Sequence, residues 1–436
     1  MKIPRAEFAR RRRRLMGLME PNSIAILPSA REQMRSRDTE YPFRQDSDFH
    51  YLCAFPEPES VLVLIPGRSH GEFVLFCRER DEEHALWHGH REGPEGACAH
   101  FGADDAFPIS DIDEILPGLI EGRERVYYSM GRSESFDRRL MGWVNRIRGQ
   151  SATGAIPPGD FTDLDHLVHE LRLKKSAAEL KLLARAGEIT AEAHCQAMRA
   201  ARPGVHEYQL EAELHYRFAL AGARYPAYPS IVGSGPNACT LHYVENRRTL
   251  RDGDLVLIDA GCEYQHYAAD VTRTFPANGR FSASQRAIYE IVLEAQRAAL
   301  AAIHPGNHWN APHQATVEVI TAGLLSLGIL QGSLGQLIES GAYRPYYMHR
   351  AGHWLGLDVH DVGDYRVAGE WRQLEAGMVM TVEPGIYIAP DAPVAARWRG
   401  IGVRIEDDAV VTEAGCRVLT DGVPRDPDDI EALMAA

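Results

Sequence analysis

Two acidic residues in the stretch "LVLIDAGCEYQHYAADVTRTF" (residues 255–275) lie inside segments that are otherwise typical of buried β-strand. Because side chains on a strand alternate between its faces, Asp259 shares a face with the two leucines before it. If the chain reverses around residues 263–266, Asp270 becomes a near cross-strand neighbour of Asp259. Two facing carboxylates on a partly apolar face repel one another and lose hydration, so the pair needs a proton, a basic partner or a cation.

A simpler interpretation is that the two aspartates are turn or edge residues in water, or that Arg273 pairs with one of them. Further candidate ligands lie downstream. The stretch "MHRAGHWLGLDVHDVG" contains His349, His353 and His360 in a glycine-rich, strand-like context. Their spacing is too loose for an H-E-x-x-H zinc helix, but one or two of them could be ligands.

Two more acids stand in apolar strand-like segments. "TVEPGIYI" sets Glu383 just before a Pro-Gly turn, and "GVRIEDD" sets Glu406 on a strand, on the same face as Arg404. Taken singly, each has an ordinary explanation as an edge charge or a salt-bridge partner. Four such acids and a histidine cluster in one half of the chain favour a common site.

The charges of this set indicate the kind of site. Four carboxylates and one neutral imidazole carry four negative charges, which two divalent cations would balance, with room for a bridging water or hydroxide. The oxygen-rich donor set favours Mn²⁺ or a similar hard ion, with Co²⁺ and Zn²⁺ as alternatives. Two such ions lower the pKa of the shared water and polarise a carbonyl or phosphoryl oxygen, which is hydrolytic chemistry.

Two domains are expected to carry these residues, because 436 residues with 45% hydrophobic side chains exceed one ordinary core. Residues 1–170 mix strand-like runs such as "SIAILPS" and "EFVLFCR" with helical stretches such as "SFDRRLMGWVNRIR", which predicts an α/β domain. The connector "GAIPPGDFTDLDHLVHELRLKKS" then leads into residues 171–436, and we place the boundary near residue 170.

Residues 171–436 combine helices with groups of strands. Ser176-x-x-Glu179 and Ser282-x-x-Gln285 are capping boxes that predict the starts of two long helices. Two more helices are expected in "HEYQLEAELHYRFALAGA" and over about 311–327, with the remainder in strands and turns. This order predicts an α+β domain whose helices cover one face of a curved antiparallel sheet.

The formal charge of −14 argues against a nucleic-acid partner. The seven cysteines form no CxxC pair and are odd in number, which fits a reducing cytoplasm better than a disulfide framework. No stretch approaches the ~20 apolar residues that span a membrane. The run of five arginines near the start lacks the apolar core of a secretory signal, so a charged first helix is expected.

The segments "DAGCEYQHYAADVTRTF", "HWLGLDVHDVG", "TVEPGIYI" and "GIGVRIEDD" together resemble the metallopeptidase family with the pita-bread fold, whose ligands follow the order Asp, Asp, His, Glu, Glu. Five residues match that order: Asp259, Asp270, His353, Glu383 and Glu406. The first half is similar as well, because "EYPFRQDSDFHYLCAFPEPES" resembles the N-terminal domain of the bacterial Xaa-Pro aminopeptidases (aminopeptidase P). Methionine aminopeptidases of this fold generally lack so large a domain, and creatinase relatives lack the metal ligands.

The resemblance implies a pita-bread catalytic domain after a smaller α/β domain, two divalent metal ions and peptide substrates with proline at the second position. One metal would be held by Asp259 and the other by His353 and Glu383, with Asp270 and Glu406 bridging both. A hydroxide bridging the two metals would attack the carbonyl before the proline. The free amine of the substrate would bind near the metal held by Asp259, so that one residue is removed.

The resemblance also implies roles around the metals. Glu383 would take the proton of the attacking water and pass it to the leaving proline nitrogen. His242 and His360 would hydrogen-bond the scissile carbonyl or the developing oxyanion, and His349 would line the proline pocket. Tyr387 and Arg404 are expected to orient metal ligands. Tyr228 and Arg404 are expected to contact the substrate. Trp87 is expected to close the cleft from this or a neighbouring subunit.

Two alternatives remain open. A prolidase shares the fold, the metals and the ligands but accepts only Xaa-Pro dipeptides. A binding protein on the same fold would be expected to have lost ligands, and none of the five is missing here. The family resemblance further suggests a homodimer or a tetramer.

Overall fold

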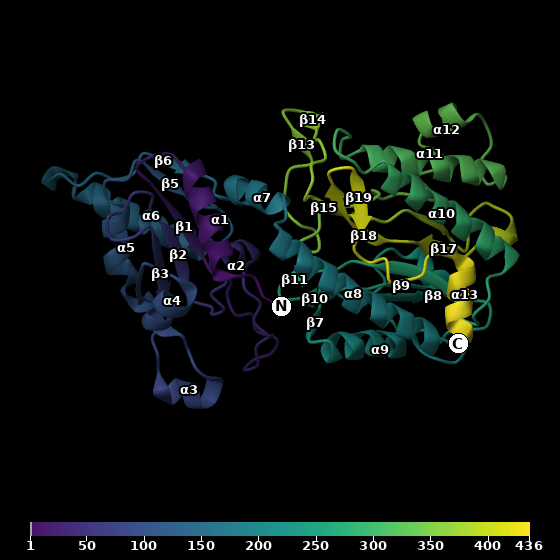
Figure 1. Cartoon of the computed structure of the whole chain (residues 1–436), viewed down its shortest axis with the longest axis horizontal. Coiled ribbons are helices and arrows are strands. Elements are labelled where there is room, and N and C mark those ends of the chain that lie inside the picture. The colour runs from purple at the N-terminus through teal and green to yellow at the C-terminus, as the bar shows by residue number, and fades with distance from the viewer. Residues whose placement is uncertain (1) are drawn as a thin grey trace. The chain divides into compact units, whose positions relative to one another are not determined.

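The computed structural model describes residues 2–436 and divides into two compact units, Ile3–Arg172 and Leu173–Ala436 (Figure 1). Within residues 2–436, no helix combines the length and the apolar character needed to cross a bilayer.

The first unit is built on one six-stranded mixed sheet in the order β4-β3-β2-β1-β5-β6. β1, β2 and β3 pair antiparallel, whereas β4, β5 and β6 join their neighbours in parallel. The strands are β1 (Ser23–Pro28), β2 (Val61–Leu64), β3 (Phe73–Cys77), β4 (Asp105–Pro108), β5 (Arg125–Tyr127) and β6 (Asp160–Thr162). The helices are α1 (Arg5–Leu18), α2 (Ser47–Cys53), α3 (Glu82–His88), α4 (Gly93–Phe101), α5 (Ile112–Ile120), α6 (Glu134–Gly149) and α7 (Asp165–Leu173).

The core of this unit forms because short apolar strands are covered by amphipathic helices. α5 and α6 turn residues such as Leu116 and Trp143 onto the sheet face that carries Ile24, Ile26 and Val63. The sequence therefore predicted these strands and α6 correctly, since their hydrophobic periods are clear.

The arginine run lies on α1, as expected, but it is not simply a charged surface. The guanidinium of Arg11 lies 4.1 Å from the ring centre of Tyr51, and that of Arg12 lies 4.0 Å from the ring centre of Phe73. Both side chains are buried and donate to backbone carbonyls of the neighbouring α2. Cation–π contacts and hydrogen bonds thus give two of the five arginines a packing role.

The second unit places helices outside several short antiparallel sheets. Its helices are α8 (Ala177–Ala200), α9 (Glu207–Leu220), α10 (Ala283–Ala301), α11 (Ala311–Ser326), α12 (Leu334–Glu339) and α13 (Pro427–Ala435). Its strands are β7 (Tyr225–Pro226), β8 (Ile231–Ser234), β9 (Leu255–Asp259), β10 (Cys262–Tyr264), β11 (Tyr267–Ala268), β12 (Thr272–Pro276), β13 (Arg366–Val367), β14 (Glu370–Trp371), β15 (Val379–Val382), β16 (Gly385–Ile388), β17 (Ile401–Arg404), β18 (Asp407–Thr412) and β19 (Gly415–Val418).

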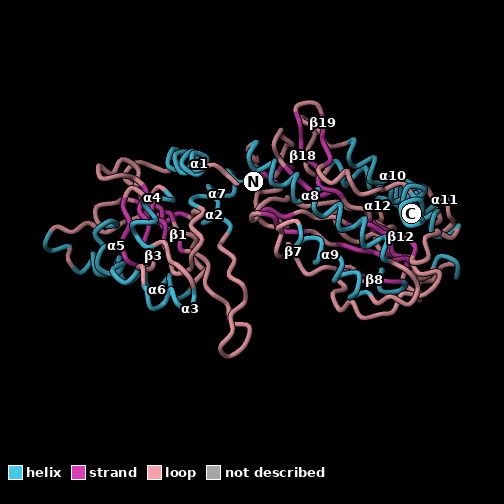
Figure 2. Tube along the Cα trace, turned by 60° about the horizontal axis from the view of Figure 1, so that its bottom comes forward, coloured by secondary structure: helices cyan, strands magenta, loops and turns pink. Residues whose placement is uncertain are grey.

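One apolar cluster joins these helices to the strands, with Ile189 of α8 and Val292 of α10 packed with Val256, Ile258 and Phe275. Figures 1 and 2 show α8, α9 and α10 lying along the outside of the strands. Both predicted capping boxes are formed, so each serine hydroxyl accepts from a backbone N–H of its helix. The α+β arrangement is as predicted, although the strands form several short sheets instead of one.

Two features of this unit differ from the expectation. The last segment is a helix, α13, whose start Asp426 caps and Pro427 opens, a signal that the sequence contained. The hairpin that carries the two aspartates turns at Gln265 and His266, which both have positive φ. This turn lies one residue later than a direct pairing of Asp259 with Asp270 would require. Each residue of β9 therefore pairs two positions further along the chain, and Asp259 stands opposite Thr272.

Candidate metal centre

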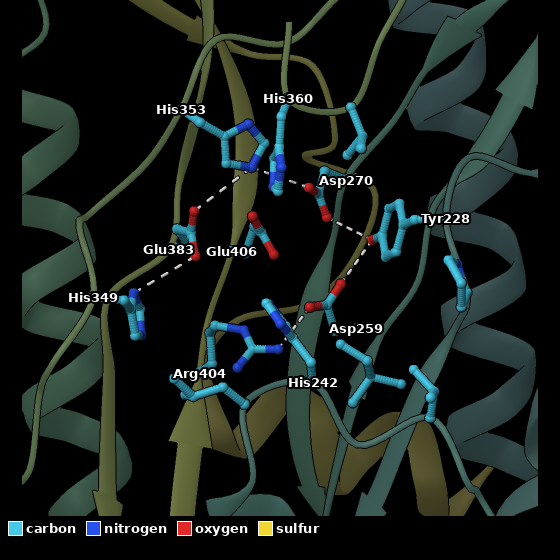
Figure 3. Close-up of a pocket in the computed structure, with 15 residues that line it drawn as sticks. Tyr228, His242, Asp259, Asp270, His349, His353, His360, Glu383, Arg404 and Glu406 are labelled. Carbon is cyan, nitrogen blue, oxygen red and sulfur yellow. Dashed lines mark hydrogen bonds and ion pairs between the residues drawn. The ribbon is translucent and has the colours of Figure 1, made fainter.

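The five predicted ligands lie where strands end or break. Asp259 is the last residue of β9, Asp270 lies between β11 and β12, and Glu383 directly follows β15. Glu406 directly precedes β18, and His353 lies in a loop. Four of the five lie outside any strand, where no ladder dictates the direction of the side chain, and all five line one cavity, as Figure 3 shows.

The sequence predicted that Asp270, Glu383 and Glu406 lie within strands, and this was wrong, because each lies just outside one. Pro384 has no N–H for a ladder, so the chain leaves one sheet at Glu383 and enters another at β16. The histidine loop crosses β15 closely: a Cβ on Gly352 would lie 2.1 Å from the carbonyl oxygen of Thr381. That glycine allows His353 to exchange hydrogen bonds with Thr381, whose backbone N–H donates to the His353 carbonyl over 2.9 Å.

The imidazole of His353 meets the carboxylates directly. Its Nε2 lies 3.3 Å from Asp270 Oδ2 and 3.6 Å from Glu383 Oε1. One ligand atom each from His353, Asp270 and Glu406 lie within 4.8 Å of one another. The pocket thus brings an imidazole nitrogen and several carboxylate oxygens to the spacing that metal coordination requires.

The ring orientation of His353 fits a metal ligand. Its Nδ1 lies 2.9 Å from the carbonyl oxygen of Trp354, which can only accept, so Nδ1 carries a proton. Burial lowers the pKa of His353, but the bond to Asp270 and the charge of Glu383 outweigh burial and raise it to about 9. The carboxylates therefore draw a positive charge to Nε2, the place that a cation would take.

Asp259 and Asp270 are joined through Tyr228. The phenolic oxygen lies 2.7 Å from Asp259 Oδ1 and 2.5 Å from Asp270 Oδ1. A single hydroxyl proton serves one of these contacts at a time, so the other requires a proton on a carboxylate or a cation beside it. The repulsive aspartate pair predicted from strand alternation is therefore present, although the two aspartates are diagonal neighbours and not directly opposite one another.

Burial raises the pKa of three carboxylates in the cavity. It raises the pKa of Glu383 to about 7, and it raises that of Asp259 and, further, that of Glu406. The charge of Asp270 adds to burial in each case, whereas Arg404 opposes it. Four acids thus share too little positive charge, and the donor set fits divalent cations.

A chain of hydrogen bonds orients Asp259. The Nδ1 of His349 donates to the carbonyl oxygen of Arg350 over 2.7 Å, so its Nε2 accepts from Tyr387, 2.9 Å away. Arg404 donates to the Tyr387 hydroxyl over 2.9 Å and to Asp259 Oδ2 over 2.6 Å. Burial lowers the pKa of His349 to about 4, so this chain holds a neutral imidazole.

The cavity has a volume of about 390 Å³. His242 and His360 are exposed at its wall, and the ring centre of His360 lies 4.3 Å from that of His353. The rest of the lining includes five apolar residues: Pro229, Ile231, Leu241, Val244 and Val359. Trp87 lies on α3 in the first unit, where it is 78% exposed, and not on the elements that form the cavity.

Sequence reasoning missed two supporting residues. The Thr272 hydroxyl donates to Glu406 Oε2 over 2.7 Å, and strand alternation from Asp270 could have found it. Asp408 accepts from the Asp270 N–H over 3.1 Å, and no local signal marks this contact because 138 residues separate the two.

Comparison with known proteins identifies the family. The profile of metallopeptidase family M24 matches residues 181–413, and the profile of the aminopeptidase P N-terminal domain matches residues 8–127. The chain belongs to metallopeptidase family M24. This confirms the resemblance inferred from the sequence, and with it the two-domain fold with a C-terminal pita-bread domain.

Relatives of this M24 metallopeptidase match it over its whole length. The Xaa-Pro aminopeptidase of Escherichia coli (strain K12) is 49% identical and covers 100% of this chain and 98% of its own. The aminopeptidase PepP of Pseudomonas aeruginosa superposes with a TM-score of 0.99 at 64% identity, over 100% of this chain and 98% of that one. The zinc-substituted E. coli aminopeptidase P with product superposes with a TM-score of 0.97 at 49% identity, over 100% and 99%. The human Xaa-Pro dipeptidase is more distant, at 34% identity over 100% of this chain and 94% of its own.

Proposed function

We propose that this M24 metallopeptidase removes the first residue from peptides that have proline at the second position. The observation that carries the proposal is the lining of the cavity, which combines acids and histidines with apolar side chains. A proline ring is apolar and brings no N–H, so the apolar part of the lining suits it. The full-length likeness to Xaa-Pro aminopeptidases supports the same reaction.

Two divalent cations would be held by five residues: Asp259, Asp270, His353, Glu383 and Glu406. When bound, such cations lower the pKa of water and polarise the substrate carbonyl. The oxygen-rich donors support Mn²⁺, with Co²⁺ or Zn²⁺ as substitutes.

The residues of the chain itself would move the proton and hold the substrate. Glu383 lines the cavity, with Oε1 3.6 Å from His353 Nε2 and Oε2 3.7 Å from His349 Nδ1. There it would accept a proton from water and pass it to the leaving proline nitrogen. His242 and His360 would donate to the scissile carbonyl as negative charge develops there. His349 would line the proline pocket.

The orienting residues would act through the acids. Arg404 and Tyr387 would hold Asp259 in place, since they are linked to it and to one another by hydrogen bonds. Arg404 also lines the cavity, as does Tyr228, so both would contact substrate in addition to binding carboxylates.

Hydrolysis of a matched peptide series tests the function. The chain is incubated with Mn²⁺ and with Xaa-Pro, Xaa-Pro-Yaa or Xaa-Ala-Yaa, and the released first residue is quantified. We expect cleavage of Xaa-Pro-Yaa, none of Xaa-Ala-Yaa, and loss of activity with a chelator. Cleavage of Xaa-Pro alone would instead identify a dipeptidase of the prolidase type.

Assembly and location are further parts of the proposal. We propose a homo-oligomer, a dimer or a tetramer, in which Trp87 closes the cleft of its own or a neighbouring subunit. Two large apolar side chains of α3 support this proposal, because Trp87 is 78% exposed and Leu86 is 83% exposed, and exposed apolar side chains often mark contact surfaces. All seven cysteines are free, which supports a reducing cytoplasm.

A further inference from the structure

A buried carboxylate outside the metal centre organises one wall of the cavity. Glu207 is the first residue of α9, and its side chain is fully buried. We infer that Glu207 is a positioning residue that aims His242 into the cavity, an inference that rests on the proposed function.

The side chain of Glu207 accepts five hydrogen bonds, all from residues of the segment 234–248. Oε1 accepts from the N–H and the hydroxyl of Ser234, both over 2.7 Å, and from the Asn237 amide over 3.1 Å. Oε2 accepts from the Tyr243 hydroxyl and from the Arg248 N–H, both over 2.8 Å. One carboxylate thus ties together the start, the middle and the end of this segment.

Only a carboxylate can do this. Its two oxygens offer about four lone-pair sites and no donor, so five converging donors saturate it. An amide at the same place would turn an NH₂ group toward the backbone N–H of either Ser234 or Arg248. That buried donor would lose its acceptor, and the segment would have to shift to satisfy it.

His242 lies within the segment that Glu207 holds. Asn237 precedes His242 by five residues and Tyr243 directly follows it, and both donate to the Glu207 carboxylate. His242, His349 and His360 all line the same cavity. Figure 3 shows the His242 ring among these cavity residues.

The geometry links the two side chains through one peptide unit. Tyr243 turns toward Glu207, whereas the adjacent His242 lines the cavity together with Leu241 and Val244. Leu241 and Tyr243 also pack on an apolar cluster that includes Tyr387. A shift of Tyr243 would therefore move His242 relative to the scissile carbonyl, where a displacement of about 1 Å can cost about 10²-fold in rate.

The test compares E207Q, H242A and the double variant E207Q/H242A by steady-state hydrolysis of Xaa-Pro-Yaa. We expect E207Q to lower kcat about 10- to 100-fold with little change in KM, because the misplaced group acts on developing charge. If Glu207 acts through His242, the double variant has the kcat of H242A. Bound Mn²⁺ per chain should stay as in the wild type in all three.

E213Q is the matched control, because Glu213 lies on the same helix and pairs with Arg217 at a 28% exposed position. It should keep wild-type kcat. Y243F serves as the second variant. It removes the hydroxyl that donates to Glu207 and accepts from the Arg247 N–H, leaves the other four bonds to the carboxylate in place, and should lower kcat in the same direction. If E207Q does not fold, Y243F decides the question.

Two results would overturn the inference: losses that multiply in the double variant, or wild-type kcat in both E207Q and Y243F. A general structural role would lower the unfolding temperature of E207Q and leave kcat unchanged. Failure of the wild-type chain to cleave Xaa-Pro-Yaa would refute the proposed function itself, which separates the two failures.

Discussion

A buried ion pair gives the sharpest stability prediction. Lys175 Nζ lies 2.9 Å from Asp361 Oδ2, and both side chains are 1% exposed. Asp361 also donates its backbone N–H to the carbonyl of Trp354 over 2.8 Å, so the pair closes the loop that carries His360. Replacing Lys175 by methionine keeps the apolar stem but takes away the ammonium group that pairs with the buried Asp361 carboxylate, which costs about 3–5 kcal/mol.

Calorimetry of the metal-free chain measures this loss. For a unit of this size each kcal/mol shifts Tm by roughly 2–4 °C, so Lys175→Met should lower Tm by roughly 6–20 °C. The neighbouring Lys174 provides the control, because it pairs with Glu375 where the two side chains are 47% and 50% exposed. Lys174→Met should cost less than about 1 kcal/mol.

Adding Asp361→Asn to Lys175→Met should restore much of the loss, because the buried charge that Lys175 balanced is then removed as well. Equal Tm shifts for the Lys174 and Lys175 variants would refute the reasoning. So would a double variant no more stable than Lys175→Met, since the cost would then lie in packing and not in charge.

Three further predictions concern the site and its support. Asp270→Ala should lower bound Mn²⁺ below two per chain and abolish hydrolysis, and a fully active variant would contradict the site assignment. Tyr387→Phe removes the hydroxyl that Arg404 and His349 share, at a cost of about 1–3 kcal/mol, so kcat/KM should fall about 5- to 150-fold; unchanged kinetics would exclude an orienting role. Burial lowers the pKa of His194 to about 4, so between pH about 6.5 and 4 the unfolded chain binds more protons. Unfolding stability should fall by about 3 kcal/mol as pH drops through that window, and the calorimetric pH profile of His194→Gln should be flatter.

Local patterns predicted much of the fold. The capping boxes at Ser176 and Ser282 were correct because their bonds close within one helical turn. Alternation placed Asp259 and Asp270 on the same side of the hairpin, and both do reach Tyr228. The exact register was wrong, since Gln265 and His266 adopt positive φ without a glycine to signal the turn.

The sequence by itself determined which side chains could bind cations, because residue type and order carry that information. Only the tertiary structure decided how they meet. The tyrosine between two aspartates and the five donors around Glu207 depend on partners from distant segments. Period and propensity describe neighbours along the chain, whereas these contacts form between strand ends and loops that packing alone brings together.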